Sequence, residues 1–124
     1  MKTISTTLAP AAIGPYSQGI IANGLIFTSG QIPLKPSGEF LDLDIREQTK
    51  LVLENLSNVL KEANSGLDYV VKTTVFLANM ADFSAMNEVY EGYFKGNKPA
   101  RSTVSVKELP KKAKVEIECI ALVK

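Results

Sequence analysis

Two alternating stretches near the end of the chain decide the fold: Pro99-Ala100-Arg101-Ser102-Thr103-Val104-Ser105-Val106 and Val115-Glu116-Ile117-Glu118-Cys119-Ile120-Ala121. Each alternates polar and apolar residues, which is typical of a β-strand with one buried face. The residues between them, Pro110-Lys111-Lys112-Ala113, are typical of a turn. The pattern therefore predicts that the two strands pair as a hairpin.

The alternation also predicts which face of the sheet each side chain occupies. The predicted core face carries the small and aliphatic residues: Val104, Val106, Val115, Ile117, Cys119 and Ala121. The other face mixes charged, polar and aliphatic residues: Arg101, Thr103, Ser105, Lys107, Glu116, Glu118, Ile120 and Leu122. A solvent-facing surface does not need Ile120 and Leu122, so we expect another subunit to cover part of this second face.

Arg101 and Glu118 are the candidate chemical groups of these strands. Arg101 is one of two arginines in the chain, and a guanidinium can hold a planar carboxylate through two parallel hydrogen bonds. A carboxylate such as Glu118 is costly on a partly buried strand unless it has a partner or a role. The structural alternatives are an ion pair of Arg101 with either nearby glutamate, and an interface salt bridge for Glu118. We interpret Glu116, on the same face, as structural.

Composition limits the classes of function. The 124 residues fit one domain, 1–124, and the formal net charge of +1 gives no electrostatic case for nucleic acid or an acidic membrane. No apolar run is long enough to span a membrane and Met1-Lys2-Thr3 starts no signal peptide, so we expect a cytoplasmic protein. Cys119 is the single cysteine, which we interpret as a small apolar core residue.

The chain contains no histidine, which excludes Ser-His-Asp and Cys-His catalysis and the commonest zinc ligand set. It also lacks glycine-rich phosphate-binding loops. A general acid or base must therefore be a carboxylate, a tyrosine or a lysine. The lysines around Pro110 are interpreted as a solvated loop, with a phosphate-binding patch as the alternative.

The remaining patterns predict an α+β domain. Strands are expected at about 2–6, 18–22, 26–29 and 69–77, with a turn at Asn23-Gly24. Helices are expected after Asp44 and after Asp82, each acting as a cap, and ending near the glycines at 66 and 96. The apolar stripe of the second helix is interpreted as core rather than as a ligand site: Phe83, Met86, Val89, Tyr90 and Phe94. We expect one six-stranded mixed sheet with two helices on one face.

Six motifs, in order, resemble the signatures of one protein family. They are Ala11-Ala12-Ile13-Gly14-Pro15-Tyr16-Ser17-Gln18, Thr28-Ser29-Gly30-Gln31-Ile32-Pro33, Val71-Lys72-Thr73-Thr74-Val75-Phe76, Asn87-Glu88-Val89-Tyr90, Pro99-Ala100-Arg101-Ser102 and Glu116-Ile117-Glu118. Each is weak alone, but together they cover nearly the whole chain. The sequence thus resembles the reactive-intermediate deaminase family, also called the YjgF/YER057c/UK114 family.

The resemblance implies a chorismate-mutase-like fold and a homotrimer with clefts between subunits. It implies hydrolysis of 2-imino acids, chiefly 2-iminobutanoate and 2-iminopropanoate, to 2-oxo acids and ammonium. These imino acids are reactive by-products of enzymes that use pyridoxal phosphate. No cofactor and no metal ion are implied.

The resemblance also implies site residues. Arg101 matches the arginine that holds the substrate carboxylate, and Glu118 matches the acid that activates water. Thr103 stands where the family commonly has cysteine, and its backbone carbonyl is expected to help hold that water. The other implied substrate-binding residues are Tyr16, Ser29, Gly30 and Asn87. Tyr16 could instead pack on the proline-rich loop, and Ser29 could satisfy backbone groups at a strand end.

The hairpin register predicts where the site is assembled. With the valines inward, Glu118 is expected opposite Ser105, which puts it roughly 13 Å from Arg101 along the strands. We therefore predict that each site combines Arg101 of one subunit with Glu118 of a neighbour. The alternatives to deamination are a non-catalytic ligand-binding or regulatory module and, with less support from the net charge and the missing histidine, an endoribonuclease.

Overall fold

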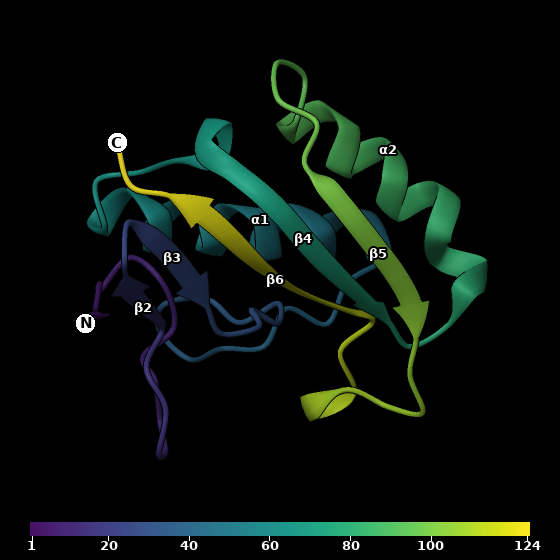
Figure 1. Cartoon of the computed structure of the whole chain (residues 1–124). Helices are drawn as coiled ribbons and strands as arrows, with labels where there is room; N and C mark the ends of the chain where they lie inside the picture. Colours follow the sequence, from purple (N-terminus) through teal and green to yellow (C-terminus); the bar gives the residue numbers. More distant parts are fainter.

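The computed structural model describes residues 1–124 and contains one six-stranded mixed sheet (Figure 1). Its strands are β1 (Lys2–Ile4), β2 (Gly19–Ala22), β3 (Leu25–Thr28), β4 (Val70–Leu77), β5 (Ala100–Ser105) and β6 (Val115–Leu122). They lie in the order β1-β2-β3-β6-β4-β5. The expected strands and the six-stranded mixed sheet are confirmed.

The first three strands form a meander through local turns. β2 and β3 pair antiparallel from Gly19 opposite Thr28 to Ala22 opposite Leu25, which leaves a two-residue turn. Asn23 and Gly24 both have positive φ, 53° and 78°, as the twist-matched hairpin turn requires. The Asn-Gly signal is therefore confirmed.

The predicted hairpin of the last two strands is wrong, because β4 lies between them. β5 pairs only with β4, in parallel, and β6 pairs with β4 and β3, antiparallel. Glu118 consequently lies opposite Thr74 rather than opposite Ser105. Pro110–Lys112 is a short 3-10 helix in the connection that carries the chain past β4.

The parallel pairing also reverses the predicted faces of β5. Arg101 and Thr103 lie opposite Thr73 and Val75, which are fully buried beneath the helices. Directly opposed residues share a face, so Arg101 and Thr103 point toward the helix side. Val104 is 46% exposed on the other side, contrary to the predicted core position. The predicted core face of β6 is confirmed, since Val115, Ile117, Cys119 and Ala121 are buried.

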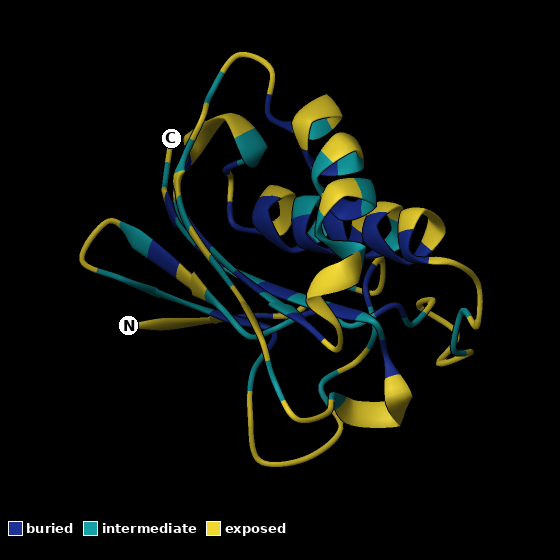
Figure 2. Ribbon diagram, turned by 90° about the vertical axis from the view of Figure 1, so that its right-hand side faces the viewer, coloured by how far each residue is buried: buried dark blue, intermediate teal, exposed yellow.

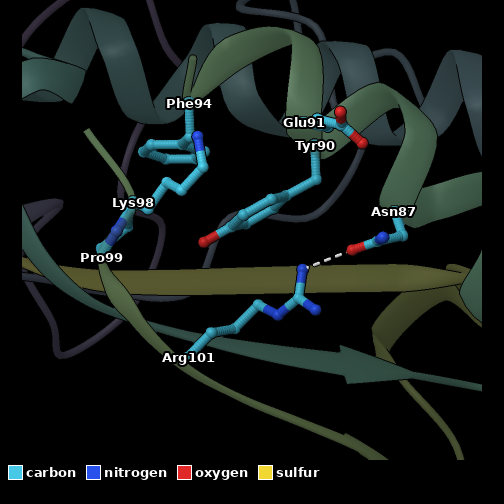
Figure 3. A pocket seen from close by; sticks show the side chains of 7 residues that line it. All are labelled: Asn87, Tyr90, Glu91, Phe94, Lys98, Pro99 and Arg101. Atoms are coloured by element: carbon cyan, nitrogen blue, oxygen red, sulfur yellow. Dashed lines mark hydrogen bonds between the residues drawn. The ribbon is translucent and has the colours of Figure 1, made fainter. Parts of the chain in front are cut away.

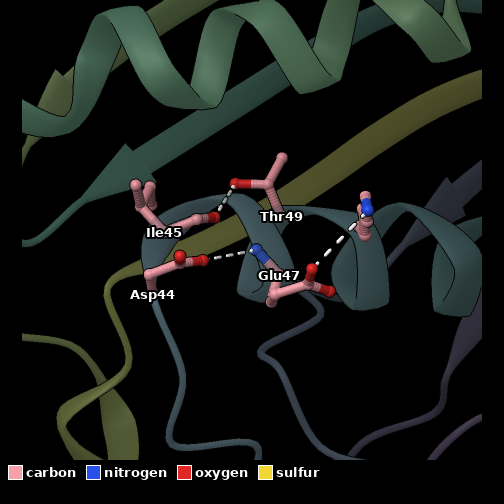
Figure 4. Close-up of polar contacts among 5 residues, drawn as sticks. Asp44, Ile45, Glu47 and Thr49 are labelled. Carbon is pink, nitrogen blue, oxygen red and sulfur yellow. Dashed lines mark hydrogen bonds and ion pairs between the residues drawn. The ribbon is translucent and has the colours of Figure 1, made fainter.

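Helix α1 (Ile45–Glu62) begins and ends through local hydrogen bonds. The Asp44 carboxylate accepts a hydrogen bond from the Glu47 backbone N–H at 3.0 Å (Figure 4), which confirms the predicted cap. The Glu47 carboxylate pairs with Lys50 at 3.6 Å, and Thr49 donates to the Ile45 carbonyl at 2.7 Å. The helix ends at Glu62, followed by Asn64 with φ of 55°, before the predicted stop at Gly66.

Helix α2 (Phe83–Tyr93) is preceded by a 3-10 turn, Met80–Asp82. Asp82 occupies the N-cap position of α2 as predicted, but its side chain makes no capping hydrogen bond; the Asn79 side chain caps the preceding 3-10 turn by accepting from the Ala81 backbone N–H at 2.9 Å. The helix ends at Tyr93, ahead of the predicted stop at Gly96.

Both helices cover the same face of the sheet, and the core lies between the two layers (Figure 2). Helix α1 contributes Val52, Leu53, Leu56, Val59 and Leu60, each at most 1% exposed. Helix α2 contributes Met86, Tyr90 and, just beyond its end, Phe94. The other sheet face has no helix over it, and it exposes Phe27, Val104 and Leu122 by 42%, 46% and 45%.

Candidate functional site

Arg101 lies on β5 beneath one face of helix α2. Its Nη1 donates a hydrogen bond to Asn87 Oδ1 at 2.6 Å (Figure 3). Its guanidinium carbon lies 4.7 Å from the centre of the Tyr90 ring and 5.5 Å from the centre of the Phe83 ring. These distances are typical of cation–π contacts. Arg101 and Asn87, two of the predicted site residues, are therefore brought together.

The guanidinium of Arg101 has no acidic partner in the chain. The three ion pairs are Lys35–Glu39, Arg46–Glu88 and Lys50–Glu47, all on the surface. The structural alternative, an ion pair of Arg101 with Glu116 or Glu118 of its own chain, is therefore wrong. Because a guanidinium has five N–H donors, Arg101 keeps donors for an anion.

A pocket of about 400 Å³ opens beside this guanidinium (Figure 3). It is lined by residues of α2 and of the segment that enters β5: Asn87, Tyr90, Glu91, Phe94, Lys98, Pro99 and Arg101. Two aromatic rings together with the cations of Arg101 and Lys98 form a surface suited to a small carboxylic acid with an apolar tail.

A second pocket, of about 270 Å³, contains other predicted site residues. Tyr16 and Gly30 line it together with Glu116, Gln18 and Pro110. Tyr16 is 54% exposed, so it is available to a ligand or to another copy of the chain. Ser29, adjacent to Gly30, donates from its hydroxyl to the Ser17 carbonyl at 2.6 Å. That bond supports the structural alternative for Ser29, the satisfaction of a backbone group at a strand end.

Glu116 lies directly against Gly30. A Cβ atom at position 30 would clash with Glu116 Oε2 and lie 2.8 Å from its carboxyl carbon, so the absence of a side chain at Gly30 lets the Glu116 carboxyl take this position. Burial raises the pKa of the Glu116 carboxyl, and the nearby negative charge of Glu118 raises it further. A carboxylate with a raised pKa in a pocket is a candidate functional group.

Glu116 is therefore an additional candidate site residue, which the sequence interpretation took as structural. Glu116 and Glu118 lie two residues apart on the same face of β6, and each stands between two apolar residues. Only the long-range approach of the Gly30 loop to Glu116 distinguishes them. Glu118 lines neither of the two pockets described, and its carboxylate forms no ion pair in the chain.

The predicted residues are divided between the two faces of the sheet. Arg101 shares the helix-covered face with Thr73, whereas Glu118 shares the open face with Thr74 and Glu116 shares it with Phe76. The two carboxylates of one chain are thus separated from its Arg101 by the sheet itself. The inference that one chain does not bring Arg101 and Glu118 together holds, although the hairpin register used to reach it was wrong.

Thr103 and Cys119 complete the group of notable side chains. The Thr103 hydroxyl is buried and has no hydrogen-bond partner in the chain. Cys119 is buried, its backbone N–H donates to Thr28 Oγ1 at 2.9 Å, and burial raises the pKa of its thiol to about 12. A thiol with such a pKa stays protonated and unreactive, as expected of a core residue.

No cluster of three or more His, Cys, Asp or Glu side chains could hold a metal ion. The structure likewise contains no helix with the length and apolarity needed to cross a membrane.

Comparison with solved structures shows how widely this architecture is shared. A putative endoribonuclease from Thermotoga maritima has a TM-score of 0.97 and 45% identity, with 100% of this chain and 98% of that chain covered. The structure of E. coli TdcF with bound serine has a TM-score of 0.95 and 42% identity, with both chains fully covered. Full coverage at this similarity means that every strand and helix has a counterpart.

Sequence comparison identifies the family. The chain is 54% identical to a protein named putative regulator AldR from Lactococcus lactis, covering 100% of this chain and 99% of the relative. It is 49% identical to the 2-iminobutanoate/2-iminopropanoate deaminase of Mus musculus, covering 98% and 90%. It is 50% identical to Reactive Intermediate Deaminase A of Arabidopsis thaliana, covering 97% and 65%. The family model described as endoribonuclease L-PSP matches residues 6–123. The chain therefore belongs to the endoribonuclease L-PSP family, which includes the reactive-intermediate deaminases that its motifs resemble.

Proposed function

We propose that this protein hydrolyses 2-imino acids, among them 2-iminobutanoate and 2-iminopropanoate, to 2-oxo acids and ammonium. The observation that carries the proposal is the Arg101 guanidinium, which has no acidic partner and faces a pocket of about 400 Å³. Relatives named as deaminases of these two imino acids, at 45–49% identity, support the substrate class.

We propose further that the complete site forms between copies of the chain, in a homotrimer. Arg101 and Glu116 lie on opposite faces of the sheet, so one chain cannot place both around one small molecule. The open face carries Phe27, Val104 and Leu122 without a covering layer, which is the arrangement expected of a subunit interface.

In the proposed reaction, Arg101 binds the substrate carboxylate and thereby fixes the position of the adjacent C=N carbon. The oxygen of a water molecule forms a bond to this carbon while the water proton passes to a carboxylate. The imine nitrogen takes up a proton, which gives a carbinolamine. The carboxylate then takes the hydroxyl proton and passes it to the amino nitrogen, the C–N bond breaks as the C=O bond forms, and ammonia leaves and becomes ammonium in water. Such positioning alone can supply several kcal/mol.

The carboxylate that accepts the proton is Glu118 in the sequence interpretation, but the geometry favours Glu116. Glu116 lies in the pocket with Tyr16 and Gly30, and its raised pKa brings the carboxylate closer to neutral pH, where a general base is most efficient. Glu118 then acts on Glu116 through its charge. The proposed role of the Thr103 carbonyl, holding the water, does not require a thiol, so threonine can replace the usual cysteine.

The test is ammonium and 2-oxobutanoate release when the protein is added to threonine dehydratase acting on threonine. Wild type is expected to accelerate release beyond the spontaneous rate. Arg101→Ala is expected to lower the catalytic efficiency about 100-fold or more, because a charge-assisted bidentate grip is lost. Arg46→Ala, which removes the only other arginine and an exposed ion pair, is the matched control and is expected to keep wild-type rates.

The second candidate is a regulatory protein that binds a 2-oxo acid without turning it over. The name of the AldR relative, at 54% identity, favours this alternative. Binding of 2-oxobutanoate with no acceleration of ammonium release would support it and end the deaminase proposal.

A further inference from the structure

The aromatic residues on the inner face of α2 contact the Arg101 guanidinium, although their spacing is that of a core stripe. Phe83, Asn87, Tyr90 and Phe94 follow one another at helical spacing, so they share one face. Tyr90 is only 7% exposed and its ring packs against Phe94 with centroids 4.6 Å apart. Core packing therefore fixes the ring that lies nearest to the guanidinium.

The far end of the Tyr90 ring is fixed as well. Its hydroxyl is hydrogen-bonded to Thr73 Oγ1 at 2.7 Å, and Thr73 is fully buried on β4. Thr73 is also the residue directly opposite Arg101 in the parallel pair. Thr73 thus contacts both groups: its backbone lies opposite Arg101 in the sheet, and its side chain holds the hydroxyl of the Tyr90 ring that covers Arg101.

We propose that Tyr90, anchored by Thr73, is the positioning residue for Arg101 and that its ring holds the guanidinium without neutralising it. This inference rests on the proposed function, because it assumes that the guanidinium binds a substrate carboxylate. An acidic partner would hold the guanidinium equally well but would compete with that carboxylate. Rings and one amide oxygen orient the cation and leave its charge to the ligand.

Glu91 lines the same pocket but forms no ion pair with Arg101, so the guanidinium is held by rings and the Asn87 amide oxygen rather than by a carboxylate. An arginine side chain loses rotamer freedom when it binds a ligand, and a platform that orders it beforehand removes part of that penalty. Tyr90 should therefore act mainly on affinity for the carboxylate and little on the chemical step.

The experiment measures dissociation constants for 2-oxobutanoate and for the uncharged 2-oxobutanamide, together with kcat and KM in the dehydratase-coupled assay. Tyr90→Leu is expected to weaken binding of the carboxylate and raise KM about tenfold, with kcat changed less than threefold and amide binding unchanged. Tyr90→Phe is expected to restore most of the carboxylate affinity because it restores the ring. Tyr93→Leu, the same substitution one turn along α2 and outside this pocket, is expected to bind both ligands as wild type does.

Two further variants test the hydrogen bond between the Tyr90 hydroxyl and Thr73. Thr73→Val leaves the buried Tyr90 hydroxyl without a partner, whereas Thr73→Val combined with Tyr90→Phe removes both ends of the hydrogen bond. The double variant is expected to be more stable than Thr73→Val alone and to bind the carboxylate better. Thermal unfolding of each variant identifies any that do not fold.

A readout without any ligand keeps the inference separate from the proposed function. In wild type, NMR signals of the Arg101 side chain should be shifted by the Tyr90 ring current, the shift should persist in Tyr90→Phe, and it should vanish in Tyr90→Leu. If the shift is present but no 2-oxo acid binds, the proposed function is wrong, whereas the proposal that Tyr90 positions the Arg101 guanidinium is supported. If folded Tyr90→Leu binds 2-oxobutanoate as tightly as wild type, or Tyr90→Phe binds it as weakly as Tyr90→Leu, the proposed role of Tyr90 is wrong.

Discussion

At the scale of single residues, the Glu116 carboxylate that we propose for catalysis also lowers the stability of the folded chain when it is ionised. Its carboxyl is partly buried against Gly30, and burial raises its pKa, so the folded chain holds the proton to a higher pH than the unfolded chain does. Between the ordinary pKa of 4.5 and the raised value, the unfolded chain releases the proton first. The free energy of unfolding therefore falls as pH rises through that window.

Glu116→Gln removes this titration. We expect the variant to be more stable than wild type at pH 7, with the difference shrinking toward pH 4, in chemical denaturation at both pH values. We also expect its turnover of 2-imino acids to fall by about 10²–10⁴, the range for loss of a general base.

Glu118→Gln is the matched control for the choice between the two carboxylates. It keeps Glu116 but removes the neighbouring charge that raises the pKa of Glu116. Its pH–rate profile is expected to shift to lower pH with most of the activity retained. Loss of activity in Glu118→Gln together with full activity in Glu116→Gln would reverse the assignment.

At the scale of elements, the segment between β5 and β6 carries backbone strain. Lys111 and Lys112 have φ of 55° and 57°, in the left-handed region that costs a residue with a side chain about 1–2 kcal/mol. Pro110, just before them, lines the pocket of Tyr16 and Glu116. The two strained residues thus turn the chain so that Pro110 closes one side of that pocket.

Lys112→Gly is expected to raise the free energy of unfolding by about 0.5–1 kcal/mol, because relief of strain exceeds the added entropy of the unfolded chain. Lys107→Gly, an exposed residue of the same connection without positive φ, is the control and is expected to be neutral or destabilising. Urea titration of both variants measures the difference. Equal effects in the two variants would contradict the strain argument.

At the scale of the whole molecule, the uncovered sheet face predicts assembly. Wild type is expected to have the mass of three chains in light scattering coupled to size-exclusion chromatography. Phe27→Lys places a charge on that face and is expected to shift the mass toward a single chain. Leu43→Lys, at a loop position 50% exposed, is the control and is expected to keep the wild-type mass. A wild type that runs as one chain at micromolar concentration would contradict the proposed trimer.

The sequence predicted features that depend on neighbours along the chain. The order of elements, the Asn23-Gly24 turn and the Asp44 cap follow from alternation and capping, and the structure confirms them. The partner of β5 could not be predicted in this way, because its parallel pairing with β4 joins residues about 28 positions apart. Without that pairing, Val104 resembles a core residue, and Arg101 resembles a surface residue although rings of α2 cover it.

The candidate site was harder to predict than the fold for the same reason. Family motifs indicated Arg101, Asn87, Tyr16 and Gly30, and the structure places the first two in one pocket and the last two in another. Glu116 and Glu118 are distinguished by the Gly30 loop, which meets β6 from far away in the sequence. Tyr90 is a buried core residue and shows the helical periodicity of one. Its contact with Arg101 depends on how α2 packs on β5, which the sequence pattern does not contain.

The single sulfur-bearing nucleophile of the chain, Cys119, is enclosed between the sheet and the helices. It can neither cross-link two copies nor be alkylated while the chain stays folded, and position 103 offers threonine instead of another thiol. Thiol-directed reagents therefore find no thiol at the proposed site. We expect the proposed deaminase activity to persist under oxidative stress, when enzymes that depend on a free thiol are inactivated.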